Sequence, residues 1–205
     1  MKQLIIALGR QVGSGGHRIG GILAQRFDLP LYDRNLLAEI AAQRQLDPEA
    51  LRQYEEAPKS RFLTRTIRGL NNSAQAGLAE LQFRFLEEKA AEGESFLVMG
   101  RCAEYILRDH PGLISLFVCR DLKDRVAVIR HAYGLSEAEA LDFIRKGDKR
   151  RAAYHSEHCP TVWGHSESYD LTINTSRLGL EGTADFLEEY IHRRIADDPT
   201  RTLQL

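Results

Sequence analysis

The sequence contains little cysteine, and its N-terminus carries only a very short hydrophobic run. Three cysteines stand far apart among 205 residues, at Cys102, Cys119 and Cys159. So few thiols at such spacing argue against a disulfide framework and favour a reducing compartment. The run Leu4–Leu8 follows a single lysine and is too short for a signal peptide or a membrane-spanning helix. The sequence therefore predicts a cytoplasmic protein without a membrane partner.

The chain also lacks an excess of charge of either sign. Its formal net charge is −1, and its isoelectric point is near 6.7. A protein that covers a broad stretch of nucleic acid needs a basic face, so this balance argues against such a partner. A small anionic ligand remains open because local charge decides its binding. With 43% hydrophobic residues in 205, the composition suits one domain with a sizeable core.

Short apolar runs alternate with helical patterns along the chain. The first run is continuous and rich in isoleucine, as is typical of a strand buried on both faces of a parallel sheet. A capping box of Ser136 and Glu139 predicts the start of a helix. This alternation predicts an α/β fold with a five-stranded parallel sheet. The expected strands are 4–8, 31–33, 95–99, 113–119 and 171–174, and the expected helices include 17–27, 121–133 and a closing helix with an apolar stripe at 184–195.

A glycine-rich segment, GRQVGSGGHRIG, separates the first strand from the first helix. The P-loop pattern is G-x-x-x-x-G-K-[ST]. When Gly15 takes the second glycine, Arg10 stands at the first glycine, Gly16 at the lysine and His17 at the hydroxyl residue. The loop therefore lacks the lysine that normally reaches the phosphates.

The physical features of a phosphate loop nevertheless remain. Gly13, Gly15 and Gly16 allow the backbone to turn its N–H groups inward, and Ser14 adds a hydroxyl donor. The loop also opens a helix, whose N-terminus attracts anions. These features predict a bound phosphate.

Two other interpretations of the glycine-rich segment remain open. Gly13 and Gly15 begin a dinucleotide-binding pattern, and Asp33 stands 20 residues after Gly13, where an acidic residue would bind a ribose. The third glycine of that pattern falls on Arg18, whose bulk opposes close helix–strand packing. The segment could also be a turn without a ligand, although packing alone explains three glycines and a flanking arginine poorly.

Arginines are the candidates to replace the missing lysine. Arg10 lies inside the loop and Arg18 in the first helical turn, and residues 145–151 form the densest basic run of the chain. On its own this run suits a solvated helix face, but it also suits a lid that closes over phosphates. Arginine fits that task because its planar fork binds phosphate oxygens bidentately.

Several motifs in this order resemble the cytidylate kinase-like family, a branch of the nucleoside monophosphate kinases. The resemblance runs from about residue 4 to 190. It implies a three-layer αβα P-loop kinase domain with its core at 1–46, 93–144 and 170–196. A helical NMP-binding insertion is then expected at about 47–92, opened by an N-cap at Asp47, and a lid at about 145–169. The motifs are IIALGRQVGSGGHRIGGILAQRF, LYDRNLL, GRCAEYIL, DKRRAAY and WGHSESYDLTINTS.

The resemblance also implies roles for particular residues. The chain would transfer the γ-phosphoryl group of ATP to CMP, dCMP or a related acceptor. The catalytic residues would be Arg10, Arg145, Asp148 and Arg151. The acceptor would bind to Asp33 and Arg101. The ATP donor would bind to Gly13, Ser14, Gly15, Gly16, His17, Arg18, Asn174 and Thr175.

Two departures from the kinase pattern leave an alternative. The loop lysine is absent, and Cys102 stands where cytidylate kinases have the aspartate of G-R-D. A nucleotide-binding or sensor protein without catalysis therefore remains the rival. Mg²⁺ is expected with ATP, held by Ser14 or Asp33 directly or through water, since the third strand does not end in an aspartate. The helical insertion could pack on the core or on a second subunit to form a homodimer.

Histidines gather after the basic run. His155, His158, Cys159 and His165 have a spacing that could suit zinc. Structural zinc sites favour several cysteines, however, and this segment has one. The sequence alone therefore favours packing roles for these residues, and also for Cys102.

Overall fold

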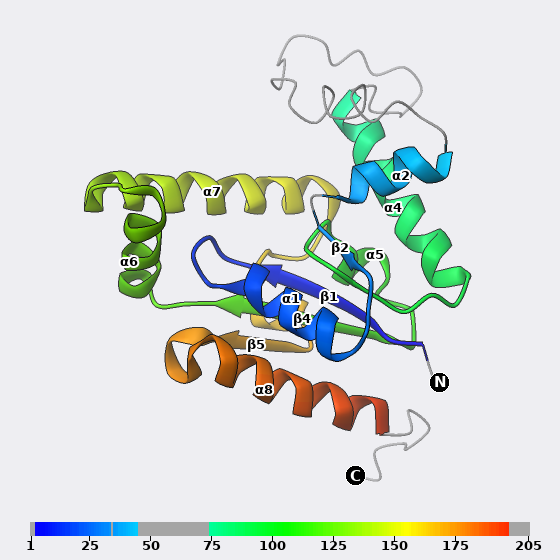
Figure 1. Cartoon of the computed structure of the whole chain (residues 1–205). Helices are drawn as coiled ribbons and strands as arrows, with labels where there is room; N and C mark the ends of the chain where they lie inside the picture. The colour runs from blue at the N-terminus through cyan, green and yellow to red at the C-terminus, as the bar shows by residue number, and fades with distance from the viewer. Residues whose placement is uncertain (1–2, 34, 45–73, 197–205) are drawn as a thin grey trace.

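The computed structural model describes residues 3–33, 35–44 and 74–196. These residues contain a five-stranded sheet in which all neighbouring strands are parallel, in the order β2-β3-β1-β4-β5 (Figure 1). The predicted five-stranded parallel sheet is confirmed. The strands are β1 (Ile5–Arg10), β2 (Leu31–Tyr32), β3 (Phe96–Val98), β4 (Leu113–Cys119) and β5 (Leu171–Asn174).

Helices cover both faces of the sheet and give three layers (Figure 1). Helices α1 and α8 pack on one face, and α2, α4 and α5 pack on the other. The helices are α1 (Gly16–Arg26), α2 (Leu36–Arg44), α4 (Ala74–Ala91), α5 (Ala103–Ile106), α6 (Leu122–Tyr133), α7 (Glu137–His158) and α8 (Thr175–Ala196), with a short 3₁₀ turn η1 (Ser166–Ser168).

Strand β1 lies in the middle of the sheet because both of its faces are apolar. Ile5 and Ala7 pack into the core with α2, α4 and α5, whereas Ile6 and Leu8 pack into the core with α1 and α8. Each fully buried isoleucine or leucine contributes about 1.5–3 kcal/mol of transfer free energy. This double burial fixes the carboxyl end of β1, from which the glycine-rich loop emerges.

Helices α6 and α7 pack against each other beside the glycine-rich loop. Ile129 of α6 and Ile144 of α7 share a small core with Val12 of the loop. The capping box forms as expected: Ser136 Oγ accepts from the backbone N–H of Glu139, and Ser136 N–H donates to the Glu139 carboxylate at 2.8 Å. The basic run belongs to α7, which is continuous from Glu137 to His158, so the first half of the expected lid is part of a longer helix.

Some expectations fall outside the described residues. The N-cap at Asp47 and residues 47–73 of the expected insertion belong to this group. The remainder of the insertion is mostly α4, which packs Phe85 and Leu86 into the core. Within residues 3–33, 35–44 and 74–196, no helix combines the length and apolarity that crossing a membrane requires.

Candidate functional site

The loop between β1 and α1 adopts a conformation that requires glycine. Gly13 and Gly15 have φ angles of 75° and 82°, in the left-handed region that side chains disfavour. A Cβ atom on Gly16 would lie 2.5 Å from Cβ of Arg10. Gly15 is the N-cap of α1 and, as a glycine, offers no side chain to cap that end of the helix. The first N–H groups of α1 and its positive dipole end therefore favour an anion.

A cleft that is partly open to solvent lies over this loop. Two guanidinium groups and one carboxylate are among its lining side chains, so the cleft suits an anionic ligand. Its lining residues are Arg10, Gln11, Gly13, Gly15, Gly16, His17, Asp33 and Arg151. Seven of the sequence-predicted site residues, all of these except Gln11, thus share one cleft.

Arg10 spans the floor of the cleft from the loop toward β3. Its Nη1 donates to the carbonyl of Met99 at 3.0 Å, and its Nη2 forms an ion pair with Asp33 at 3.2 Å. The Cβ and Cγ atoms of Arg10 occupy the space beside Gly16, where a P-loop would carry its lysine side chain. Arg10 therefore places a fixed positive charge next to the position of the missing lysine.

Arg151 supplies the second cation, from the far side of the cleft. It extends from α7, and its Nη1 donates to the carbonyl of Arg10 at 2.6 Å. Burial lowers the pKa of the Arg151 guanidinium from its ordinary value, while the charge of Asp148 opposes this shift. An arginine remains protonated under such conditions, so α7 contributes a positive charge to the cleft.

Asp148 does not line the cleft; it holds the loop instead. Its Oδ1 accepts from the backbone N–H of Val12 at 2.8 Å, and its Oδ2 forms an ion pair with Arg125 of α6. Arg125 Nε in turn donates to the carbonyl of Val12 at 2.7 Å. One ion pair therefore fixes both polar backbone groups of one loop residue, which makes Asp148 a positioning residue.

Ser14 and Thr175 also stabilise the loop from within. Ser14 is fully buried, its Oγ donates to the carbonyl of Gln11 at 2.9 Å, and the same oxygen accepts from the N–H of Gly16 at 3.3 Å. Thr175, at the start of α8, donates its hydroxyl to the carbonyl of Ser14 at 2.9 Å. Both hydroxyls are thus used to maintain the loop, and neither residue lines the cleft.

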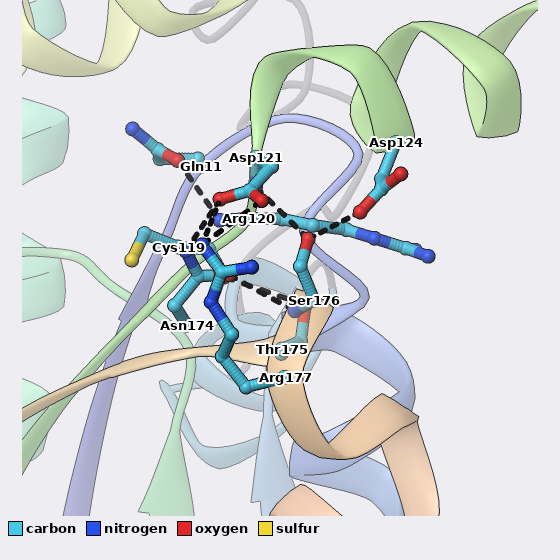
Figure 2. Close-up of polar contacts among 9 residues, drawn as sticks. All are labelled: Gln11, Cys119, Arg120, Asp121, Asp124, Asn174, Thr175, Ser176 and Arg177. Atoms are coloured by element: carbon cyan, nitrogen blue, oxygen red, sulfur yellow. Dashed lines mark hydrogen bonds and ion pairs between the residues drawn. The ribbon is translucent and has the colours of Figure 1, made fainter.

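Asn174 belongs to a polar network that joins the carboxyl ends of β4 and β5 (Figure 2). Its amide donates to Asp121 at 2.7 Å, and Arg177 forms an ion pair with the same carboxylate at 3.2 Å. Gln11 accepts from the backbone N–H of Arg120 at 3.2 Å and so links this network to the loop.

Three of the predicted arginines lie away from the cleft lining. Arg18 is exposed on α1 and pairs with Glu181 of α8 at 3.1 Å. Arg145 is exposed on α7. Arg101 follows β3 with a φ of 60° and lies beside Tyr154 of α7. The structure therefore does not bring these arginines to the loop.

Asp33 and Ser14 were the expected ligands of a magnesium ion. Asp33 lies in the cleft with Oδ1 3.2 Å from Arg10 and Oδ2 2.9 Å from Nδ1 of His17. Both carboxylate oxygens thus face nitrogen donors, and the Ser14 hydroxyl is engaged within the loop. Neither residue fits as a direct ligand of the ion in this arrangement.

Sequence reasoning missed Arg125, as it missed Gln11. Arg125 is 6% exposed although it is charged. Its spacing in the sequence was a signal. Arg125 precedes Val126 by one residue and Ile129 by four, and all three lie on the buried face of α6. A buried charge requires a partner, and only the folded chain shows that this partner is Asp148.

Comparison with solved structures supports the fold. An uncharacterized protein from Eubacterium ventriosum ATCC 27560 is 33% identical with a TM-score of 0.73, over 93% of this chain and 99% of that chain. The shikimate kinase of Bacteroides thetaiotaomicron is 17% identical with a TM-score of 0.54, over 92% and 98%. The shikimate kinase of Acinetobacter baumannii, solved in complex with shikimate, is 15% identical with a TM-score of 0.53, over 93% of this chain and 94% of that chain. Among curated proteins, the search finds no match.

The shikimate kinases share the three-layer arrangement and so confirm the predicted P-loop kinase fold. The family model of the cytidylate kinase-like family matches residues 5–177, which include the loop, the cleft and both arginines. The chain belongs to the cytidylate kinase-like family.

Proposed function

We propose that this protein is a nucleoside monophosphate kinase that transfers the γ-phosphoryl group of ATP to CMP, dCMP or a related acceptor. The observation that carries the proposal is the pair of arginines over the loop. Arg10 and Arg151 line the cleft together with three glycines at the N-terminus of α1. Family membership supports a phosphotransferase of the kinase type.

The chemistry follows from positioning and charge. Phosphoryl transfer asks little covalent chemistry of the protein, because its catalysis consists mainly of alignment and stabilisation of the charged transition state. The loop N–H groups would hold the donor phosphates. Arg10 and Arg151 would then stabilise the negative charge on the transferring group from two sides. Charge-assisted hydrogen bonds from arginine suit this task better than neutral donors do.

The acceptor would bind on the side of the cleft where Asp33 lies. Asp33 follows β2, the strand at the edge of the sheet, and its pairing with Arg10 places it beside the proposed donor phosphates. Arg101 lies at the carboxyl end of the adjacent strand β3 and would contact the acceptor farther out. Cys102 departs from the aspartate of cytidylate kinases, so the acceptor is to be chosen by experiment among nucleotides and other phosphate acceptors.

The donor base would lie at the opposite end, beside the network in Figure 2. The Nε of the Arg120 side chain is buried there without a hydrogen-bond partner among the described residues. A planar guanidinium can stack on a base. That Asn174 and Thr175 lie near the donor base stays a proposal, which the available guanidinium of Arg120 supports.

Mg²⁺ is the ion that P-loop kinases generally use with ATP, and it would neutralise phosphate charge when bound. Ser14 and Asp33 do not fit as its direct ligands, as described above. We therefore assign it no protein ligand and derive no step through it.

The test is a coupled ADP-release assay with ATP and Mg²⁺ against CMP, dCMP, UMP, AMP, GMP, shikimate and no acceptor. Turnover above the acceptor-free control supports the proposal, and the best acceptor names the substrate. Arg10→Ala should lower kcat far more than it weakens ATP binding, because its charge acts on the transition state. ATP binding by calorimetry without any turnover would instead favour the nucleotide-binding protein without catalysis.

The matched control for this assay is Arg145→Ala. Arg145 stands on the same helix as Arg151 but is exposed and outside the cleft lining. Arg151→Met should reduce kcat/KM by about 10- to 100-fold, the loss expected for one charge-assisted hydrogen bond. Arg145→Ala should leave it within about twofold. Equal losses in the two variants would refute the role of Arg151.

A further inference from the structure

A cluster of metal-binding side chains lies outside the cleft, beneath the turn that carries Arg101. Cys102 and Glu104 come from the turn between β3 and α5 and from α5 itself. His155 and Cys159 come from the last turn of α7 and its C-cap. All four residues are buried, and the side chains of Glu104 and His155 are each 4% exposed. None of them lines the cleft over the glycine-rich loop.

The donor atoms of this cluster converge. One ligand atom each of Glu104, His155 and Cys159 lies within 4.8 Å of the others. The thiol of Cys102 interacts with that of Cys159, so a second sulfur lies beside this group. A tetrahedral ion takes donor atoms about 2.0–2.3 Å away. Small adjustments of these side chains would therefore suffice to surround one.

The orientation of His155 is the feature that points to a metal. Its Nε2 lies 2.9 Å from a carboxylate oxygen of Glu104. Its Nδ1 is buried and has no hydrogen-bond partner among the described residues, and the Cys159 thiol is the neighbour that interacts with the ring. A histidine that ligates a metal through one nitrogen almost always donates its other N–H to a carboxylate or a carbonyl. His155 has this arrangement, with Nδ1 left for the ion.

We propose that this cluster binds one Zn²⁺ ion through Nδ1 of His155 and the sulfurs of Cys102 and Cys159. Glu104 orients the imidazole and is the remaining donor within reach of the fourth position. Sulfur and imidazole ligands select zinc over magnesium or calcium, which require oxygen. Ligation would satisfy the buried Nδ1 and convert two buried thiols into ligands.

The folded chain selects other partners than the sequence suggested. Of the histidines near Cys159, His158 packs edge-on against Phe83 and at a tilt against Tyr154. His165 has a side chain that is 54% exposed, beside Glu167. Cys102 and Glu104, more than 50 positions upstream of Cys159, take their place. The sequence segment offered one cysteine, whereas the structure offers two.

Such an ion would join two parts of the protein that matter for the proposed function. The turn at Gly100, Arg101 and Cys102 has three consecutive positive φ angles, of 73°, 60° and 58°. The ion would tie this turn to the end of α7, the helix that also carries Asp148 and Arg151. The zinc proposal does not depend on the kinase proposal, because metal content is measured without turnover.

The test uses the full chain purified under reducing conditions. Metal analysis by inductively coupled plasma mass spectrometry should find one zinc per chain. After chelation, titration with Co²⁺ should produce the near-ultraviolet thiolate-to-cobalt charge-transfer band and visible bands of a tetrahedral site. Cys159→Ser and Cys102→Ser should each weaken Zn²⁺ binding at least tenfold and remove or reduce the band. His155→Ala should also weaken Zn²⁺ binding. It should retain a weak thiolate-to-cobalt band, because both cysteines remain.

The control variant is Cys119→Ser. Cys119 is the third cysteine, and its Sγ contacts the carbonyl of Ile173 in the sheet rather than the cluster. It should retain one zinc and the full cobalt spectrum. Circular dichroism confirms that each variant is folded. Absence of stoichiometric zinc together with no cobalt spectrum in wild type overturns the proposal. Equal loss in Cys119→Ser overturns it as well, and so does a Cys102–Cys159 disulfide found by thiol titration in zinc-free wild type.

Discussion

Replacement of Asp148 by asparagine tests whether the glycine-rich loop is held from α7. The carboxylate accepts from Val12 N–H at 2.8 Å and pairs with Arg125. Asparagine keeps the size of the side chain but has one oxygen for these two donors and turns an amide N–H₂ toward one of them. The Arg125 guanidinium, 7% exposed, then loses the charge that compensates it.

The magnitude follows from the exposure of the pair. Breaking a fully buried ion pair costs about 3–5 kcal/mol. The Asp148 side chain is 19% exposed, so solvent reduces the loss, and we expect about 2–3 kcal/mol. For a chain of this size each kcal/mol lowers Tm by about 2–4 °C, which gives a decrease of about 5–10 °C. If ATP binding must supply half of the lost 2–3 kcal/mol to order the loop, the Kd for ATP rises about tenfold.

Differential scanning calorimetry measures the first effect, and isothermal titration with ATP measures the second. The matched control is Asp142→Asn on the same helix, whose partner Lys146 is 2.7 Å away with both side chains more than half exposed. Exposed pairs contribute little, so this variant should change the free energy of unfolding by at most about 0.5 kcal/mol. If Asp148→Asn behaves like Asp142→Asn in both measurements, the loop is not held in the way described.

Three further variants probe the loop and the cleft. Gly16→Ala should abolish ATP binding measurable by calorimetry, because the new Cβ would lie 2.5 Å from Cβ of Arg10. Gly21→Ala, on the same helix, is the control: its Cβ would meet nothing within 4 Å, and the variant should bind ATP normally. Asp33→Asn should raise the acceptor KM at least tenfold and leave the ATP Kd within about threefold; a matching rise in ATP Kd would contradict its place on the acceptor side. Thr175→Val leaves the Ser14 carbonyl without its hydroxyl donor and should lower the free energy of unfolding in urea by about 1–2 kcal/mol, while no change would show that the bond contributes nothing.

The sheet could be predicted from the sequence mainly because its central strands β1, β3 and β4 are apolar on both faces. The expected strands 113–119 and 171–174 agree with β4 and β5 at both ends. The same pattern of continuous apolar runs identified β1, whose neighbours on either side also present apolar faces. The glycine positions likewise predicted the loop, because a positive φ at Gly13 and Gly15 follows from local backbone geometry alone.

The separate roles of the polar residues could not be predicted from the sequence. The resemblance to the cytidylate kinase-like family grouped Asp148 with Arg151, because both belong to the motif DKRRAAY. In the structure Asp148 turns to Val12, 136 positions earlier, and Arg151 enters the cleft. Such pairings depend on how α7 packs against the loop, which a single sequence does not record. The same reason explains why Cys102 and Cys159 were not recognised as neighbours.

The lysine-free loop is therefore best understood as part of a larger assembly of α1, α6 and α7. Its glycines shape the backbone, and the pair of Asp148 and Arg125 fixes it in place. Its positive charge comes from Arg10 within the loop and from Arg151 on a helix far along the chain. We infer that this arrangement performs the electrostatic work of the usual lysine.

The most direct test of that inference is the rate of ADP formation from ATP and Mg²⁺ with the best acceptor, in wild type and in Arg151→Met. The account predicts acceptor-dependent turnover in wild type and a kcat/KM about 10- to 100-fold lower in the variant, with Arg145→Ala near wild type. Full activity in Arg151→Met would contradict the central claim, because the loop would then work without the second arginine of its cleft.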